Sequence, residues 1–207
     1  MIIGVRRSLL KVKRAIVVVT TTFDPAHLGP GVNLSNGNLK ATGNSITGGT
    51  WSNATGTVYK ATGKFYAEVT VGAATAVDLV GIASNSAPTN NYIGSTTAGA
   101  GWVNDNRVLI GGSQVATVSS WSTGNVLCIA VDLGNQNIWF RVGGGNWNNN
   151  VSANPATNTG GVSISGVGGS PFALGASINA NGDNFTVNFG ASAYVQAVPS
   201  TDFGNWV

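Results

Sequence analysis

Apolar and polar residues alternate along much of this chain in short runs, a pattern typical of β-strands that bury one face. Residues 63–72 (GKFYAEVTVG) show it most regularly, with Phe65, Ala67, Val69 and Val71 at alternate positions. Because successive side chains of a strand point to opposite faces, these four residues share one face. The run therefore predicts a strand with one side in a core.

Further strand-like runs are separated by turn residues. Asn36 and Gly37 lie between two short apolar runs, which is a strong hairpin signal. Residues 77–84 are more continuously apolar and predict a buried strand. Strands are also expected at residues 107–118, 171–178 and 184–190. Since no helical pattern of ten or more residues appears, we expect an all-β fold, a two-sheet antiparallel β-sandwich of the jelly-roll type.

The hairpin predicted at residues 124–147 (GNVLCIAVDLGNQNIWFRVGGGNW) has an unusual second face. Its large aliphatic side chains fall on one face, whereas Cys128 and Ala130 fall on the other, together with Trp139 and Arg141. Small side chains leave space above a sheet, so this face is either a shallow groove or a bed for a covering loop. Trp139 and Arg141 are therefore candidates for ligand contact; the alternative is an arginine stacked on a tryptophan beneath a loop.

Charge is scarce and unevenly distributed. Charged residues make up 8% of the chain, against roughly 25% in an average globular protein. Beyond residue 14, five basic residues face seven acidic ones, a net charge of −2. A nucleic-acid-binding protein is expected to carry a basic patch on its fold, so specific nucleic-acid binding is not expected. The other five basic residues lie near the N-terminus: Arg6, Arg7, Lys11, Lys13 and Arg14.

Residues 1–22 are predicted to form an N-terminal arm, and residues 23–207 a single domain. The apolar run at 15–19 is too short for a membrane span, which needs about 20 apolar residues. A secretory signal would need a longer apolar region and a small-residue cleavage site. We expect instead that the arm anchors the chain to a neighbouring subunit, within a homo-oligomeric assembly. Whether it docks as a strand or as a helix is left open.

Four stretches, taken in order, resemble the SPRY domain, a concanavalin-like β-sandwich. They are GKFYAEVTV (63–71), VGIAS (80–84), GNVLCIAVDLGNQNIWF (124–140) and PFALGASINANGDNFTVNFG (171–190). The resemblance covers roughly residues 30–193. Asn125 departs from the family pattern, because an acidic residue usually follows that glycine. The resemblance implies a two-sheet sandwich whose end loops recognise a partner.

The chain is also similar in amino-acid composition to the SPRY-like domains of tailed-bacteriophage virion proteins. It is poor in acids and rich in Asn, Thr and Gly, as in NPATNTGG (154–161) and YVQAVPSTDFGNW (194–206). In such virion proteins the domain lies on fibres, spikes or capsid decorations. This similarity implies localisation in a virion, assembled in the host cytoplasm.

Residues with catalytic or metal-binding chemistry are few. His27 is the single histidine and is expected in a turn, with Asp24 accepting a backbone hydrogen bond nearby. Cys128 is the single cysteine and is expected to be a small buried apolar residue. No two carboxylates are brought together by local spacing. The sequence therefore predicts no enzyme activity, no cofactor and no metal site.

Binding chemistry is better represented. Aromatic rings stack on the apolar faces of sugars, and Asn and Asp side chains hydrogen-bond hydroxyl groups. Several tryptophans lie in or beside loops rich in Gly, Asn and Ser. The loop candidates for ligand binding are Trp102, Asn104, Asp105, Arg107, Trp121, Trp147 and Asn148. The alternative for each tryptophan is that it plugs an end of the sandwich.

These observations favour a non-enzymatic virion protein of a tail fibre, spike or head fibre. Its arm would bind other virion subunits, and its sandwich would contact a host-surface glycan or protein during adsorption. One alternative is a capsid or tail decoration protein that only stabilises a lattice. A second alternative is a bacterial SPRY-type adaptor that binds a peptide.

Overall fold

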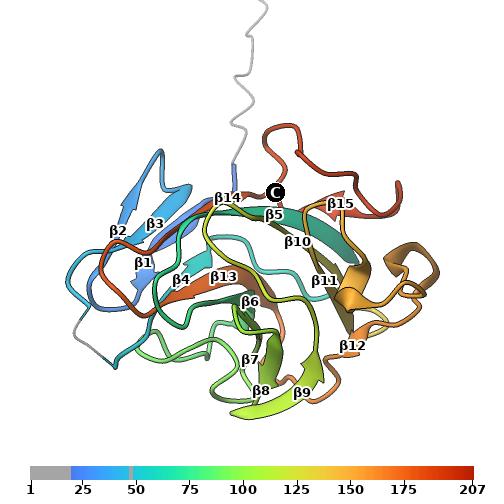
Figure 1. The fold of residues 1–207 in the computed structure, drawn as a ribbon, viewed down its shortest axis with the longest axis horizontal. Helices are drawn as coiled ribbons and strands as arrows, with labels where there is room; N and C mark the ends of the chain where they lie inside the picture. Colours follow the sequence, from blue (N-terminus) through green and yellow to red (C-terminus); the bar gives the residue numbers. More distant parts are fainter. Residues whose placement is uncertain (1–19, 47–48) are drawn as a thin grey trace, which may run out of the picture.

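The alternating runs pair into two β-sheets whose apolar faces pack against each other (Figure 1). The computed structural model describes residues 20–46 and 49–207. One sheet contains β1 (Phe23–Leu28), β4 (Ser52–Gly56), β13 (Phe172–Ile178), β6 (Leu79–Ser84), β7 (Gly99–Val103), β8 (Arg107–Ile110) and β9 (Ser113–Thr117), in that spatial order. We call it the seven-stranded sheet.

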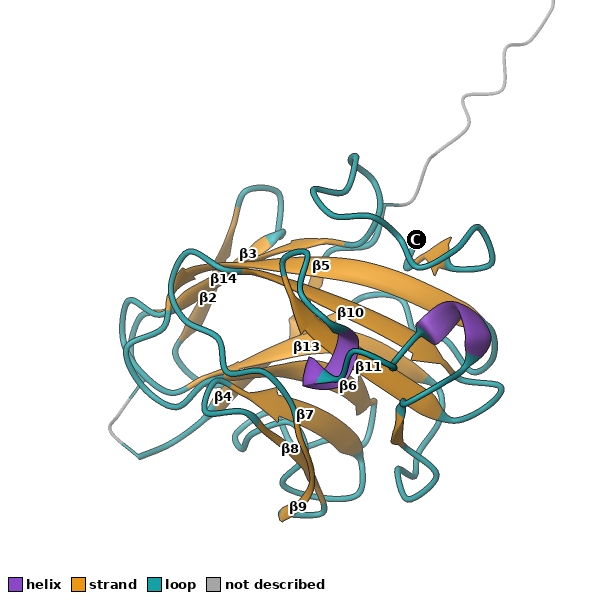
Figure 2. Ribbon diagram, turned by 45° about the vertical axis from the view of Figure 1, so that its right-hand side comes forward, coloured by secondary structure: helices purple, strands orange, loops and turns teal. Residues whose placement is uncertain are grey.

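The second, eight-stranded sheet lies over the first, as the turned view in Figure 2 shows. Its spatial order is β12 (Val162–Ser163), β11 (Asn137–Val142), β10 (Val126–Asp132), β5 (Lys64–Ala73), β14 (Asn184–Asn188), β3 (Lys40–Gly43) and β2 (Val32–Ser35), and β15 (Gly204–Asn205) pairs with β5. Apart from the parallel β5–β15 pair, neighbouring strands are antiparallel. The all-β, two-sheet sandwich predicted from the sequence is confirmed.

Helical structure in the described residues is limited to two short 3-10 helices, η1 (Trp147–Asn149) and η2 (Pro155–Thr157). Both follow β11, and Figure 2 shows them beside that strand. A search of the described residues finds no helix with the length and apolarity that a membrane crossing requires.

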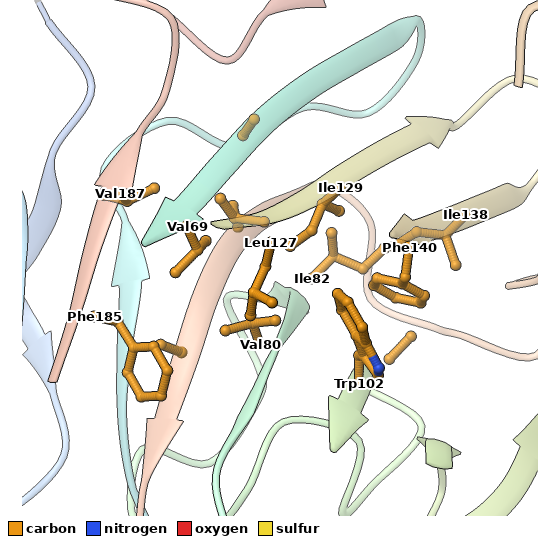
Figure 3. Close-up of a cluster of buried hydrophobic side chains, with 14 of the residues drawn as sticks. Val69, Val80, Ile82, Trp102, Leu127, Ile129, Ile138, Phe140, Phe185 and Val187 are labelled. Carbon is orange, nitrogen blue, oxygen red and sulfur yellow. The ribbon is translucent and has the colours of Figure 1, made fainter. Parts of the chain in front are cut away.

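The core lies between the two sheets and uses the faces that alternation predicts. From the eight-stranded sheet, Val69, Leu127 and Phe140 point toward Val80 and Trp102 of the seven-stranded sheet (Figure 3). All five side chains are buried. Burying one large apolar side chain contributes about 1.5–3 kcal/mol, so this interface is the main source of folding stability.

Five strands were not predicted: β12 and β15 have only two residues each, and β1, β4 and β7 are rich in small or polar residues. β1, β4 and β7 have the sequences FDPAHL, SNATG and GAGWV. The expectation that His27 lies in a turn is therefore wrong, since it lies in β1, although Asp24 accepts a hydrogen bond from the Ala26 backbone N–H as expected. In β7, small residues are required by close packing: a Cβ at Gly101 would lie 2.1 Å from the Ile93 carbonyl oxygen.

The outer face of the eight-stranded sheet is covered, which answers the question raised by the 124–147 hairpin. Ala130 and Trp139 share this face, as predicted; they pair across the hairpin, and both are fully buried. They pack with Tyr66 of β5, with Trp147 and with Phe203 of the C-terminal segment. The space above the small residues is therefore a bed for covering loops, and it is not a groove.

A buried carboxylate fixes the C-terminal segment on this face. Glu68 is 2% exposed and accepts hydrogen bonds from the backbone N–H groups of Val195 and Gln196, at 2.8 and 2.7 Å. The hydroxyl of Tyr66 donates a third, at 2.9 Å. Burial raises the pKa of Tyr66, so this hydroxyl keeps its proton and stays a donor.

The sandwich begins slightly earlier than predicted. Thr21, assigned to the arm, is fully buried, and its hydroxyl donates to the Trp206 carbonyl oxygen at 2.6 Å. The predicted arm residues 1–19 lie outside the described residues. Thr21 ties the start of the sandwich to its C-terminal end.

Replacing Glu68 by alanine is expected to lower the free energy of unfolding by about 3 kcal/mol, because three buried donors lose a charged acceptor. Urea unfolding measures this loss. Asp202→Ala removes an exposed carboxylate of the same C-terminal segment and should change the free energy by less than about 0.5 kcal/mol. Equal stability of the Glu68 variant and the wild type would show that the segment is not held by this carboxylate.

Candidate functional site

The tryptophans predicted to contact a ligand are buried. Trp102 lies in β7 rather than in a loop, is 0% exposed, and donates its indole N–H to the Ser119 carbonyl oxygen at 2.8 Å. Trp121 is 4% exposed and meets Trp102 edge to face, with ring centroids 6.2 Å apart. Trp147 is 7% exposed. Their rings therefore leave little surface for stacking on a ligand. Their burial agrees with the alternative, in which each tryptophan plugs the sandwich.

The two candidates on the second face are also enclosed. The indole N–H of Trp139 donates to the Thr159 carbonyl oxygen at 2.8 Å. The guanidinium of Arg141 lies 4.3 Å from the centroid of the Trp147 ring, and it donates to the Ala197 carbonyl oxygen. An arginine therefore stacks on a tryptophan beneath covering loops, and the stacking partner is Trp147.

Asn148 has a structural part in the same region. Its side-chain oxygen accepts from the Phe140 backbone N–H at 2.8 Å, and its amide donates to the Gly160 carbonyl oxygen at 2.9 Å. Its φ of 48° is left-handed, a conformation that asparagine tolerates better than most residues. The side chain holds η1 and the following loop against β11.

Of the remaining loop candidates, Asp105 and Arg107 stay at the surface. Arg107 donates to both carboxylate oxygens of Asp105, from Nε at 3.0 and 2.9 Å and from Nη2 at 2.7 Å. These bonds to Arg107 are the main reason that the pKa of Asp105 lies below its usual value. Asn104 is used internally, because its amide donates to the Ala76 carbonyl oxygen at 2.7 Å. The hydrogen bonds to Asp105 thus hold the Arg107 side chain in a fixed position.

Arg107 stands at the rim of a hollow on the outer face of the seven-stranded sheet, which we call the aromatic pocket. Its volume is about 240 Å³. Outward-facing side chains of β6, β7 and β8 line it, together with two aromatic rings from loops. The lining residues are Trp51, Val77, Leu79, Tyr92, Val103, Arg107 and Leu109.

The rings of the aromatic pocket are positioned by direct contacts. Trp51 and Tyr92 meet edge to face, with centroids 5.1 Å apart and an interplanar angle of 66°. The indole N–H of Trp51 donates to the Val77 carbonyl oxygen at 3.0 Å. Both rings are half-buried and pack on the small apolar cluster of Leu79, Val103 and Leu109. The pocket therefore offers fixed aromatic surface beside one cation.

Only Arg107 of this pocket was among the predicted ligand-binding residues. Trp51 lies far in sequence from most other members of the pocket, and Tyr92 follows a polar loop. Leu79, Val103 and Leu109 look like ordinary strand residues. One available signal was the continuous apolar run at 77–84, because a strand buried on both faces needs something to cover its outer face.

Two buried carboxyl groups meet behind the pocket, although sequence spacing brings no acids together. Asp78 and Asp183 are both 0% exposed. Asp183 accepts hydrogen bonds from the backbone N–H and hydroxyl of Thr75, both at 2.8 Å, and from the Ala76 N–H at 3.2 Å. The Thr75–Ala76 segment therefore engages both carboxylate oxygens of Asp183.

Asp78 has fewer donors than Asp183. The Asn179 backbone N–H donates to its Oδ1 at 2.9 Å, whereas its Oδ2 is buried without a hydrogen-bond partner. Burial raises the pKa of Asp78 to about 8, and the carboxyl group of Asp183 adds to the shift, while the Asn179 backbone N–H acts in the opposite sense. Asp78 lies in sequence between the pocket residues Val77 and Leu79.

Metal-binding clusters are absent from the described part of the chain: no three His, Cys, Asp or Glu side chains converge there. Cys128 is buried and unpaired, as expected. A second hollow of about 530 Å³ lies between β9 and β12, and we call it the edge groove. Asn148 borders it, together with Val115 and Val162.

Comparison with solved structures places this fold among SPRY domains. The SPRY domain of human HERC1 superposes with a TM-score of 0.65 at 14% identity, covering 83% of this chain and 99% of that one. A human SPRY domain gives 0.57 at 9% identity, covering 79% and 98%. Stonustoxin gives 0.57 at 14% identity, covering 81% of this chain and 27% of the toxin. The chain has an SPRY-like β-sandwich fold, as the four motifs imply.

Searches by sequence find no counterpart. No protein-family model matches the chain, and no curated protein matches it. The structural similarity at 9–14% identity establishes the fold alone.

The Asp78–Asp183 pair predicts a specific pH dependence of stability. Because the folded-state pKa of Asp78 is raised from 3.8 to about 8, the folded protein binds more protons between these values, and the free energy of unfolding falls as pH rises through this window. Asp78→Asn removes this ionisation and leaves the size of the side chain almost unchanged.

Urea unfolding at pH 5, 7 and 9 measures this effect. The Asn variant should lose less stability than the wild type between pH 5 and 9, by on the order of a few kcal/mol. Asp202→Asn, at an exposed carboxylate, should follow the wild type. Parallel pH profiles for the wild type and Asp78→Asn would contradict the raised pKa of Asp78.

Proposed function

We propose that this chain is a non-enzymatic virion protein of a tailed bacteriophage, whose SPRY-like sandwich binds a host-surface glycan through the aromatic pocket. The observation that carries the proposal is the pocket itself. Trp51 and Tyr92 supply ring surface over an apolar floor, and Arg107 supplies N–H donors at the rim. Sugars combine apolar C–H faces with hydroxyl groups, so this combination suits them.

The volume of the aromatic pocket limits the size of the ligand that it can hold. At about 240 Å³ it is smaller than the 300–1,000 Å³ typical of pockets for drug-sized ligands. It suits a single sugar ring at the end or side of a chain. Asp105 adds two acceptor oxygens beside the arginine, which can receive hydroxyl hydrogen bonds. A glycan with an exposed terminal hexose fits this chemistry best.

Placement in a virion is supported by how charge is distributed. Five of the ten basic residues lie in the first fourteen positions, whereas the remainder carries a net charge of −2 and an uncharged polar surface rich in Asn, Thr and Gly. This separation suits an attachment arm joined to a display domain. The arm would bind neighbouring virion subunits, and the domain would face the host.

A lattice-stabilising decoration protein is the second candidate, and the edge groove favours it. The residues that line this groove carry no charge, which suits subunit packing. A peptide-binding bacterial adaptor is the third candidate, and the SPRY-like fold is compatible with it. Detection of the chain in purified phage particles would exclude the adaptor, and glycan binding by the domain would separate the first candidate from the second.

Alanine at Trp51 or Tyr92 is expected to weaken glycan binding by about three- to tenfold, because one ring contact contributes about 0.5–1.5 kcal/mol and its neighbour loses support. Binding to a glycan array, followed by titration calorimetry with the best ligand, measures the effect. Tyr59→Ala is the matched control, since Tyr59 is a half-buried tyrosine outside the pocket. Unchanged binding by both pocket variants would eliminate the aromatic pocket as the site.

Removal of residues 1–19 should leave a folded domain, because residues 21–207 build both sheets and the core between them. This truncated chain should bind glycan as the full chain does, and it should no longer enter the assembly. Incorporation into particles, compared by co-sedimentation for the two forms, checks the expectation. Normal incorporation of the truncated chain would refute the anchoring role of the arm.

A further inference from the structure

The edge groove lies where both sheets end on the same side of the sandwich. β9 is the last strand of the seven-stranded sheet, and β12 is the last strand of the eight-stranded sheet. Residues of both strands line the groove between them. Among the described strands β9 pairs with β8 alone, so the outward half of its backbone N–H and C=O groups has no strand partner.

The β9 edge carries no charged residue and no proline, although a register shift interrupts its pairing with β8. Native sheet edges commonly carry charged residues or proline, which discourage pairing with another chain. The opposite edge of the same sheet, β1, contains Asp24, Pro25 and His27, whereas β9 reads SQVAT. Val115, in the middle of β9, is 47% exposed. This edge has the properties of a surface that pairs with a further strand.

The groove chemistry restricts its occupant to an uncharged, extended, apolar segment. Its lining contains Ile110, Val115 and Val162 together with Ser, Thr, Asn and Gly, and no charged side chain. This chain contains such a segment outside the described structure: residues 15–19 read AIVVV, four of them β-branched. β-Branched residues favour extended backbone, and five residues are a usual strand length.

The segment is too close in sequence to β1 to reach the edge groove of its own subunit. Residue 19 is two residues from Thr21, so it lies within about 7 Å of it. Thr21 leads into β1, which is six strand spacings from β9, about 29 Å at 4.8 Å per spacing. The six residues from Thr21 back to residue 15 span at most about 22 Å when extended, so the segment reaches a β9 edge only on another copy.

We propose that residues 15–19 of one copy add as a β-strand to the β9 edge, in the edge groove of a neighbouring copy. Donor and acceptor surfaces lie on opposite edges of one subunit, so the contact is head-to-tail and builds rings or filaments. The five basic residues before the segment face a neighbour whose body has a net charge of −2. The inference rests on the attachment role given to the arm, and it does not depend on glycan binding.

The test mixes two full-length variants with complementary defects. Val17→Asp/Val18→Asp places charge on both faces of the donor segment and leaves the groove intact. Val115→Asp charges the groove and leaves the donor intact. Light scattering after size-exclusion chromatography should show assemblies larger than a dimer for the wild type, monomers for each variant alone, and a 1:1 dimer for the mixture.

Val195→Asp is the matched control, because Val195 is 70% exposed and lies outside the groove. It should assemble like the wild type, and circular dichroism confirms that each variant is folded. Val115→Lys repeats the groove test with the opposite charge. A fluorescent peptide of residues 11–19 should bind the donor-defective variant and should not bind Val115→Asp; a scrambled peptide should bind neither.

Three results would overturn the inference: a monomeric wild type at about 100 μM, normal assembly of Val115→Asp, or a mixture that stays monomeric. Glycan binding measured on the same proteins separates the two proposals. If the wild type stays monomeric but Trp51→Ala still abolishes glycan binding, strand addition fails and the proposed recognition function stands. If assembly follows the predictions but no glycan binds, strand addition stands and the proposed recognition function fails.

Discussion

Packing of the two sheets against each other is the constraint on which the rest of this structure depends. Val69, Leu127 and Phe140 from one layer meet Val80 and Trp102 from the other, and these contacts set which face of every strand points outward. Because side chains alternate along a strand, burying Val80 in the core turns Leu79 outward, where it forms part of the floor of the aromatic pocket. The position of the aromatic pocket is therefore set by which strand residues point into the core.

The two outer faces are used differently. Over the eight-stranded sheet, the C-terminal segment and the loop after β11 cover the small residues, held by Glu68 and by the stack of Arg141 on Trp147. Over the seven-stranded sheet, Trp51 and Tyr92 cover the apolar residues only in part. The covered face gives stability, and the partly covered face leaves aromatic surface beside a fixed arginine. The β9 edge adds a third surface, which is uncharged.

Alternation was sufficient to predict the sandwich, the 124–147 hairpin and its register, because large aliphatic residues mark the core face directly. It missed β1, β4 and β7, whose buried residues are mainly Gly, Ala, Asn and Ser, and it therefore placed Trp102 in a loop. The aromatic pocket was missed for another reason: Trp51, Tyr92 and Arg107 meet only after β6, β7 and β8 pair. Fold-dependent contacts of this kind leave no local pattern in the sequence.

Both proposals require that the sandwich presents the aromatic pocket outward while its β9 edge faces a neighbouring copy. Electron cryo-microscopy of the assembly formed by the full-length chain would show both surfaces at once. We expect an additional strand along β9 in every subunit contact, with Trp51, Tyr92 and Arg107 open to solvent. A structure with the aromatic pocket buried between subunits, or with β9 free at the surface of the assembly, would contradict this expectation.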